Sequence, residues 1–330
     1  MRLATIETGT GPAVAAAAGE DQAITLARVA ELSGKAFDVP RSMQHLIESG
    51  PDYARAIRGA LDSIDEDTLA AAATEPTQWY PPVCRPGKIL AVAMNNSASN
   101  ARKITAPDHP AFFLKPASCL IGHGQTVRIR SYYGSVHPEP ELALVVGRRL
   151  KDASPEEALA HVFGYTIFDD ITGNGMRAED RFHYWAIYAS ADNPDQTEKV
   201  EQHLSYAARY KGTDCFGVLG PWLVTADEAG DPDALSVRCS IGAEPIADDN
   251  TRYYNYKIAE VLSFISQFQT LEPGDIVSLG TAFKPGSTRK SIHQADLQRV
   301  AGPIEISIEN LGTQRSPVAV DSRPLARWRL

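Results

Sequence analysis

The sequence predicts an α+β fold that is mostly β, in which a small N-terminal α/β domain precedes a larger β-rich domain. Three observations support this prediction. From Lys88 onward, apolar runs of strand length alternate with glycine-containing turns, and helical periodicity is rare. Residues 1–85 instead contain two helical stretches. Residues 74–87 carry four prolines, as linkers often do, so we place the domains at residues 1–85 and 86–330.

The N-terminal domain should contain one strand and two helical stretches. Residues 1–6 have the composition of a short strand. Residues 23–32 have apolar side chains at spacings of three and four, which indicates a helix. Residues 42–64 show the same spacing, but Gly50 and Pro51 should divide this segment because proline breaks a helix interior.

Two strands of the larger domain enclose a short helix. Residues 142–146 are apolar and partly β-branched, which is typical of a buried strand, and residues 165–168 indicate a second one. Between them, Ser154 followed by Glu157 marks a helix start, and we expect this helix to continue to residue 163. The remaining expected elements are a helix over residues 256–268 and a strand over residues 276–279.

The composition limits the possible functions. Apolar residues make up 43% and charged residues 22%, as in ordinary soluble globular proteins. The formal net charge of −9 argues against a nucleic-acid partner, which would favour a basic surface. No apolar run approaches the ~18 residues of a membrane span, so we expect no membrane partner. The cysteines are widely spaced without a CxxC pair, and a cytoplasmic protein with reduced thiols is the simplest interpretation.

Carboxylates flank the two predicted strands. Side chains two residues apart on a strand share a face, so Glu139 and Glu141 should point the same way. Asp169 and Asp170 follow the second strand. Converging carboxylates without a nearby cysteine suit a hard divalent cation such as Mg²⁺ or Mn²⁺. The alternative is an acidic strand edge with solvated charges.

Several catalytic motifs are absent from the sequence. It contains no GxSxG elbow, no HExxH pair, no P-loop and no GxGxxG after a strand. A serine hydrolase, a zinc protease or a nucleotide-dependent enzyme therefore lacks support. A site of hard oxygen ligands for a metal ion is the best remaining chemistry.

Seven segments of the larger domain, including Glu139-Pro140-Glu141, resemble the fumarylacetoacetate hydrolase superfamily and occur in its order. They are residues 110–115, 139–143, 164–170, 211–214, 219–221, 271–275 and 280–281. The resemblance implies a mixed β-roll for the catalytic domain, which is usually dimerised, so we expect a homodimer. A shared fold is weaker evidence for the reaction, because one fold hosts many chemistries.

The resemblance also implies a set of metal ligands. Glu139, Glu141 and Asp170 match the carboxylates that hold Mg²⁺ or Mn²⁺ in the family, and Asp169 stands beside them where many members have asparagine. The expected substrate is a small anionic 2-oxo acid, which can chelate such an ion through its carboxylate and keto oxygens. The ion then acts as a Lewis acid and stabilises an enolate.

Further residues are assigned by their match to family segments. Lys211 and Thr281 match catalytic positions, where an ammonium can move a proton and a hydroxyl can meet a carboxylate. Arg177, Gly280 and Lys115 are assigned to substrate binding. Read without the resemblance, Lys211 fits a surface lysine better than a catalytic one, and Thr281 could be an ordinary loop residue. Arg177 fits a surface position as well as an anion clamp.

The sequence departs from the hydrolytic members at the segment that covers their site. Those members carry a histidine and a glutamate there to activate water, whereas this chain has Ser99 at the histidine position and no glutamate soon after. We expect residues 95–108 to act as a closing cover, with His109 or another group replacing the missing pair if water is activated. Residues 177–209 fit no branch well and should shape a pocket or lid of their own.

The sequence supports more than one function. The leading hypothesis is a metal-dependent enzyme acting on a small 2-oxo or 2,4-dioxo acid through an enolate, by hydrolytic C–C bond cleavage. Some segments, such as residues 122–124, are similar to the branch that dehydrates 2-keto-3-deoxy sugar acids, so a lyase is the runner-up. Decarboxylation or isomerisation would share the enolate. A catalytically silent binding protein is the alternative from a different class.

Overall fold

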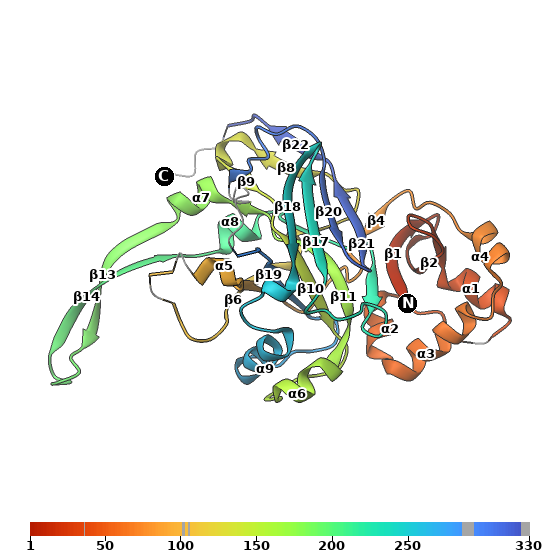
Figure 1. Ribbon diagram of the computed structural model, residues 1–330, viewed down its shortest axis with the longest axis horizontal. Helices are drawn as coiled ribbons and strands as arrows, with labels where there is room; N and C mark the ends of the chain where they lie inside the picture. Colours follow the sequence, from red (N-terminus) through yellow and green to blue (C-terminus); the bar gives the residue numbers. More distant parts are fainter. Residues whose placement is uncertain (36, 101–102, 105, 286–293, 325–330) are drawn as a thin grey trace.

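The computed structural model describes residues 1–35, 37–100, 103–104, 106–285 and 294–324. It is 38% strand and 24% helix, which confirms the predicted α+β, mostly β class. Within the described residues the largest sheet has 12 strands and crosses the middle of the molecule (Figure 1). The main path of this sheet runs β3 (Ala23–Thr25), β2 (Gly11–Ala17), β1 (Arg2–Thr8), β16 (Leu223–Thr225), β11 (Val162–Asp169), β10 (Pro140–Val146), β19 (Ile276–Thr281), β5 (Ile89–Ala93) and β6 (Ala111–Lys115).

Smaller strands extend this sheet or form separate pairs. Strand β4 pairs with β1, and β15 pairs with both β11 and β7. The bounds of the smaller strands are β4 (Trp79–Tyr80), β7 (Leu120–Gly122), β15 (Gly217–Leu219), β9 (Val136–His137), β12 (Thr172–Gly173), β8 (Val127–Arg130) and β22 (Val318–Asp321). The last four form two separate pairs, β9 with β12 and β8 with β22.

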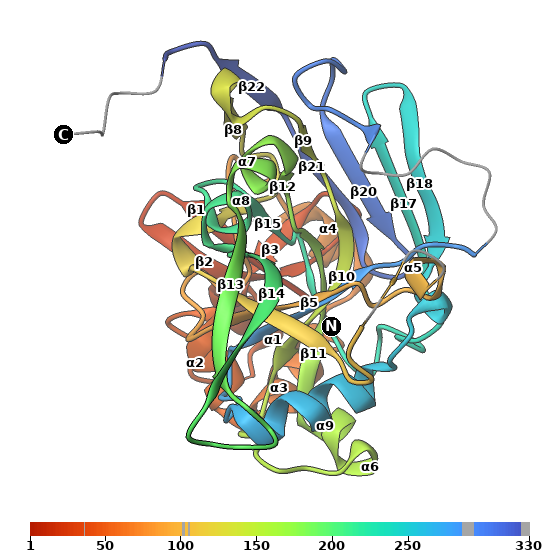
Figure 2. The same ribbon diagram turned by 90° about the vertical axis from the view of Figure 1, so that its left-hand side faces the viewer.

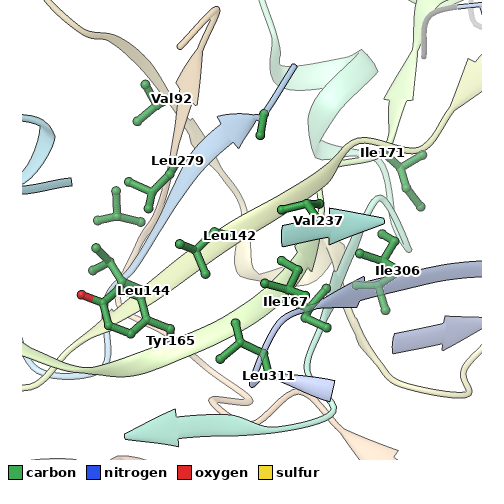
Figure 3. Close-up of a cluster of buried hydrophobic side chains, with 14 of the residues drawn as sticks. Val92, Leu142, Leu144, Tyr165, Ile167, Ile171, Val237, Leu279, Ile306 and Leu311 are labelled. Atoms are coloured by element: carbon green, nitrogen blue, oxygen red, sulfur yellow. The ribbon is translucent and has the colours of Figure 1, made fainter. Parts of the chain in front are cut away.

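A second sheet packs against the large one. Its order is β18 (Glu244–Asn250), β17 (Ser236–Ile241), β20 (Ile304–Ile308) and β21 (Gly312–Ser316). Figure 3 shows side chains of β10 and β11, such as Leu142 and Ile167, lying against Val237 and Ile306 of this second sheet. These side chains are fully or almost fully buried. Each such large aliphatic side chain contributes roughly 1.5–3 kcal/mol through its removal from water.

Strand β10 divides the interior into two hydrophobic cores. Because side chains alternate along a strand, Leu142 and Leu144 pack into the core that faces the second sheet. Ala143 and Val145 instead pack into the core shared with the N-terminal helices. The strand is buried on both faces, and this explains its continuous apolar sequence.

The N-terminal part adds strands to the large sheet and covers one of its faces with helices. Strand β1 confirms the first prediction and pairs antiparallel with β16, so the sheet continues across the predicted domain boundary. The predicted helix over residues 23–32 is partly wrong: residues 23–25 form β3, and the helix begins only after the cap residue Thr25. The helices here are α1 (Leu26–Ser33), α2 (Met43–Glu48), α3 (Gly50–Leu61) and α4 (Glu66–Ala72), with the break at Gly50-Pro51 as predicted.

Two helices lie side by side at the lower end of the molecule (Figures 1 and 2). The capping box of Ser154 and Glu157 is confirmed, but the helix it starts, α6 (Pro155–Ala158), is shorter than predicted. A 3₁₀ turn over Leu159–His161 follows, and β11 begins at Val162. The predicted helix over residues 256–268 is α9 (Ile258–Phe268), and the strand after it is β19.

A long hairpin, which we call the arm, projects away from the body of the protein (Figure 1). It consists of β13 (Arg181–Ala189) and β14 (Thr197–Ser205), paired antiparallel from Arg181–Ser205 to Ala189–Thr197. The arm lies between α7 (Asn174–Glu179) and α8 (Ala208–Gly212). At its root, Arg209 of α8 forms ion pairs with Glu179 and Asp180. No helix among the described residues is long and apolar enough to cross a membrane.

Candidate metal centre

Strand pairing brings three carboxylates to one place. Glu139 immediately precedes β10, Glu141 lies within it, and Asp170 immediately follows β11. The two strands pair antiparallel with Pro140 opposite Asp169, and the Asp170 amide donates a hydrogen bond of 3.0 Å to the Glu139 carbonyl. One carboxylate oxygen from each of Glu139, Glu141 and Asp170 lies within 4.8 Å of the others. This arrangement can surround a single small cation.

Two buried lysines contact the same carboxylates. Lys211, on α8, donates to Glu139 Oε2 at 2.8 Å and to Asp170 Oδ2 at 2.5 Å. Lys115, at the end of β6, contacts Asp170 Oδ1 and donates to the Phe216 carbonyl at 2.9 Å. Lys115 and Lys211 are 3% and 7% exposed, so neither is a surface lysine. Three carboxylates and two ammonium groups leave one net negative charge in the cluster.

The turn at the end of β19 supports Glu141. The Gly280 amide donates to Glu141 Oε2 at 3.1 Å, and the Thr281 hydroxyl lies 3.5 Å from Glu141 Oε1. Gly280 has a φ of +87°, which lets the strand turn so that its amide meets the carboxylate. Both sequence-predicted residues therefore lie at the centre, where they contact a carboxylate. Sequence reasoning missed Ser278, which donates to Glu141 Oε2 at 2.5 Å; the signal was a lone polar residue in an apolar strand.

A second missed residue is His137, which is completely buried. Its Nε2 lies 3.0 Å from Glu139 Oε1, and its Nδ1 lies 3.1 Å from the side-chain amide of Asn174. Because the Asn174 amide donates to Nδ1, we assign the proton to Nε2, which donates to Glu139. A histidine that holds a carboxylate in this way fixes its orientation toward a metal ion.

The carboxylates have opposite electrostatic environments. Burial would raise the pKa of Glu139, but the charge of Lys211 and the hydrogen bond from His137 hold that pKa well below its ordinary value. Burial, reinforced by the charges of Asp170 and Glu139, raises the pKa of Glu141 well above its ordinary value. Burial also raises the pKa of Asp169 to about 7. The two lysines therefore do not fully compensate the buried carboxylates.

A divalent cation fits these residues. The donor set is oxygen only, as Mg²⁺ and Mn²⁺ prefer. The Glu139 amide donates to Asp169 Oδ1 at 2.8 Å. The other oxygen of Asp169, Oδ2, is buried without a hydrogen-bond partner among the described residues. A positive ion beside these groups would stabilise the ionised form of Glu141, whose pKa burial raises.

Other predicted residues lie away from the carboxylates. Arg177 is an exposed residue of α7, and its guanidinium stacks over the Tyr210 ring at 5.8 Å from the centroid. His109, the candidate replacement base, stacks on Phe264 with ring centroids 4.9 Å apart. Among the described contacts, neither residue forms a hydrogen bond or ion pair with the three carboxylates. Arg177 therefore reaches a bound substrate only if that substrate extends toward α7.

The predicted cover begins at the site. Asn95, which is 1% exposed, donates to the Leu279 carbonyl at 2.9 Å and accepts from the Tyr256 amide at 2.8 Å. Asn96 donates to the Thr281 carbonyl at 3.1 Å, so the start of the cover is attached to the turn that supports Glu141. A short helix, α5 (Ser97–Asn100), follows. The side chain of Ser99 and residues 101–102 and 105 lie outside the described part of the chain.

A mixed sheet with two buried carboxylates and one partly buried carboxylate at adjoining strand ends defines a candidate enzyme centre for a hard divalent cation. Residues 88–319 match the model of the fumarylacetoacetate (FAA) hydrolase C-terminal domain. This match spans more than half of the chain, which therefore belongs to the fumarylacetoacetate hydrolase family. The resemblance inferred from the seven segments is confirmed.

Curated relatives differ in the reactions their names describe. The chain is 29% identical over 270 residues to a 2,4-didehydro-3-deoxy-L-rhamnonate hydrolase from Sphingomonas sp., covering 82% of this chain and 86% of the relative. It is 30% identical over 254 residues to a mitochondrial oxaloacetate tautomerase of Bos taurus, covering 76% of this chain and 72% of that protein.

Solved structures share the whole fold. A maleylpyruvate hydrolase from Sphingobium sp., in complex with manganese(II) and pyruvate, superposes with a TM-score of 0.65 at 25% identity, covering 97% of this chain and 99% of that one. A 5-carboxymethyl-2-hydroxymuconate delta-isomerase from Mycobacterium smegmatis has a TM-score of 0.63 at 23% identity, covering 98% and 100%. The second match, at lower identity, shows the fold alone.

Proposed function

We propose that this protein is a divalent-metal-dependent enzyme that acts on a small 2-oxo or 2,4-dioxo acid through an enolate, by hydrolytic cleavage of a C–C bond. The observation that carries the proposal is the convergence of Glu139, Glu141 and Asp170 within 4.8 Å, with Lys211 in contact with two of them. A relative named as a hydrolase covers 82% of the chain. The manganese and pyruvate held by the Sphingobium hydrolase support both the ion and the class of substrate.

Each residue of the site would have a distinct role in such a reaction. Glu139, Glu141 and Asp170 would hold Mg²⁺ or Mn²⁺, which when bound supplies Lewis-acid stabilisation of negative charge on a substrate oxygen. Lys211 lies beside these ligands, where its ammonium would bind an anionic substrate and transfer a proton to a departing carbon or oxygen. Thr281 would orient a substrate carboxylate through its hydroxyl. Lys115 holds Asp170 in place.

A second candidate reaction is elimination or isomerisation. The water-activating histidine and glutamate of hydrolytic members are replaced, since Ser99 stands at the histidine position. A hydroxyl without a base partner is a weak nucleophile and a poor base at neutral pH. Dehydration of a 2-keto-3-deoxy sugar acid, decarboxylation, or keto–enol isomerisation needs no such pair. The relative named as an oxaloacetate tautomerase favours the last of these.

An isotope experiment separates these reactions. The purified protein with Mg²⁺ or Mn²⁺ is incubated in ¹⁸O-water with 2,4-dioxo acids and with 2-keto-3-deoxy sugar acids, and the products are analysed by mass spectrometry. Label in a newly formed carboxylate would establish hydrolysis. Loss of water without carbon cleavage would replace hydrolysis by dehydration. Absence of metal-dependent turnover on every one of these acids, and of any acceleration of oxaloacetate tautomerisation followed by ultraviolet absorbance, would contradict the enzyme proposal.

We propose further that the protein acts as a cytoplasmic homodimer. Its four cysteines are free, as expected for reduced thiols. One face of the arm presents Phe182, Tyr184 and Tyr188, which are 40–54% exposed, and a second copy of the chain is the partner we propose for them. Light scattering coupled to size-exclusion chromatography should give twice the chain mass of 35.8 kDa, and a monomeric mass would contradict the proposal.

A further inference from the structure

The opposite face of the arm carries a cluster of metal-ligating side chains. His183 of β13 and His203 of β14 stand directly opposite each other in the register of the hairpin. Their rings stack with centroids 4.0 Å apart and planes inclined by 12°. Glu201 lies two residues before His203 and therefore on the same face. The aromatic residues Tyr184 and Tyr188 belong to the other face, because their register partners are Gln202 and Glu198.

The ligand atoms of this cluster already converge. Nε2 of His183 contacts Oε1 of Glu201, and Nε2 of His203 lies 4.0 Å from the same oxygen. One ligand atom from each of His183, Glu201 and His203 lies within 4.8 Å of the others. The three side chains are 52–72% exposed, so an ion from solution can reach them and small side-chain rotations can turn their ligand atoms toward it.

The chemistry of this cluster differs from that of the carboxylate centre. Two imidazole nitrogens and one carboxylate oxygen form a set that Zn²⁺, Ni²⁺ and Cu²⁺ prefer, whereas Mg²⁺ prefers oxygen ligands alone. We propose that His183, Glu201 and His203 form a second metal site, which binds Zn²⁺ or a similar transition-metal ion and joins the two strands of the arm. The remaining coordination positions face solvent.

A metal cross-link would stabilise the arm. Within the described residues, β13 pairs only with β14 and β14 only with β13. An isolated two-stranded hairpin is marginally stable in water, because it lacks a third strand or a helix to cover either face. An ion held by one ligand from β13 and two from β14 stabilises the paired state, since it binds the formed hairpin and not the separated strands.

Trp185 offers a local reporter of binding. It is directly opposite Glu201 in the register and lies on the face that carries the two histidines. Paramagnetic Ni²⁺ at the site should quench its fluorescence. The protein is first stripped of metal and then held in excess Mg²⁺ to fill the proposed carboxylate centre. Titration with Ni²⁺ should quench the emission of the wild type, and most of that quenching should be absent from Trp185→Phe.

Calorimetric titration with Zn²⁺ in the same buffer measures the site directly. We expect at least about tenfold weaker Zn²⁺ binding in each of His183→Ala, His203→Ala and Glu201→Gln. Removal of a residue that only orients a metal ligand already weakens binding by about 10–100-fold, and removal of the ligand itself should cost no less. Glu198→Gln is the matched control, since it removes the same charge from the same strand on the opposite face. It should bind Zn²⁺ as the wild type does.

Two results would overturn the proposal. One is Zn²⁺ affinity that is unchanged when His183 and His203 are both replaced by alanine. The other is an equal loss in Glu198→Gln and Glu201→Gln, which would indicate diffuse attraction by the arm's negative charge. Far-ultraviolet circular dichroism of each variant, compared with wild type, establishes that the body remains folded, so a change in binding can be assigned to the arm.

Discussion

Lys211 and Glu139 form a largely buried ion pair, with Nζ 2.8 Å from Oε2. The same ammonium lies 2.5 Å from Asp170 Oδ2. Burial would lower the pKa of Lys211, but the charges of Asp170 and Glu139 outweigh burial and raise that pKa above its ordinary value. Lys211 therefore shares its carboxylate partners with the proposed cation. An ion that binds those carboxylates would leave the lysine free to turn to an anionic substrate.

Glu141→Ala should abolish binding of Mg²⁺ and Mn²⁺ and all metal-dependent turnover, because the site loses the ligand that Gly280 and Ser278 hold in place. Electron paramagnetic resonance of Mn²⁺ measures the bound fraction. The exposed residue Glu244 provides a control in Glu244→Ala. Wild-type Mn²⁺ affinity in Glu141→Ala would contradict the assignment, provided that circular dichroism shows a folded protein.

Lys211→Ala should reduce turnover by roughly 10²-fold or more, the usual effect of removing a general acid–base group. Its Mn²⁺ affinity should not fall, since the variant lacks a charge that competes for Glu139 and Asp170. Steady-state kinetics and Mn²⁺ titration of the same preparation measure both. Lys151→Ala, at a side chain 40% exposed, serves as the control. Wild-type rates would exclude Lys211 from the reaction.

Ser278→Ala should weaken Mn²⁺ binding by about 10–100-fold, the usual effect of removing a group that orients a ligand. The serine donates to Glu141, and without that hydrogen bond the ionised carboxylate is less stable. Ser263→Ala is a matched control, because Ser263 is also buried but donates to the Ala153 carbonyl. Equal affinities in the two variants would show that Ser278 has no role in ion binding.

Asn95→Ala should lower the free energy of unfolding by about 1–3 kcal/mol, because the buried Leu279 carbonyl and the partly buried Tyr256 amide lose their hydrogen bonds. Urea denaturation followed by circular dichroism measures this change. Turnover should fall as well, since the proposed cover starts at this residue. An exposed asparagine in the loop between β13 and β14 supplies the control, Asn193→Ala. Unchanged stability and turnover would show that Asn95 does not attach the start of the proposed cover to the site.

Local sequence patterns correctly predicted those elements whose structure is set mainly by the residues within them. The alternation of a strand placed Glu139 and Glu141 on one side, and the break at Gly50 and Pro51 followed from the geometry of proline. Predictions failed where a distant segment competed for the backbone. The helix after Ser154 does not continue to residue 163, because Val162 instead begins β11 and pairs with Val146 of β10.

The sequence alone indicated the family, because seven segments resemble it in order, and that resemblance implied the candidate metal ligands. Local periodicity predicted only the mostly β class and several individual elements. Tertiary structure decided how the site is completed. Lys115 and Lys211 meet at Asp170 from segments far apart in the chain, and Ser278 reaches Glu141 only because β19 pairs with β10. The arm shows the same limit, because only the folded chain shows that, among the described residues, no third strand pairs with β13 or β14.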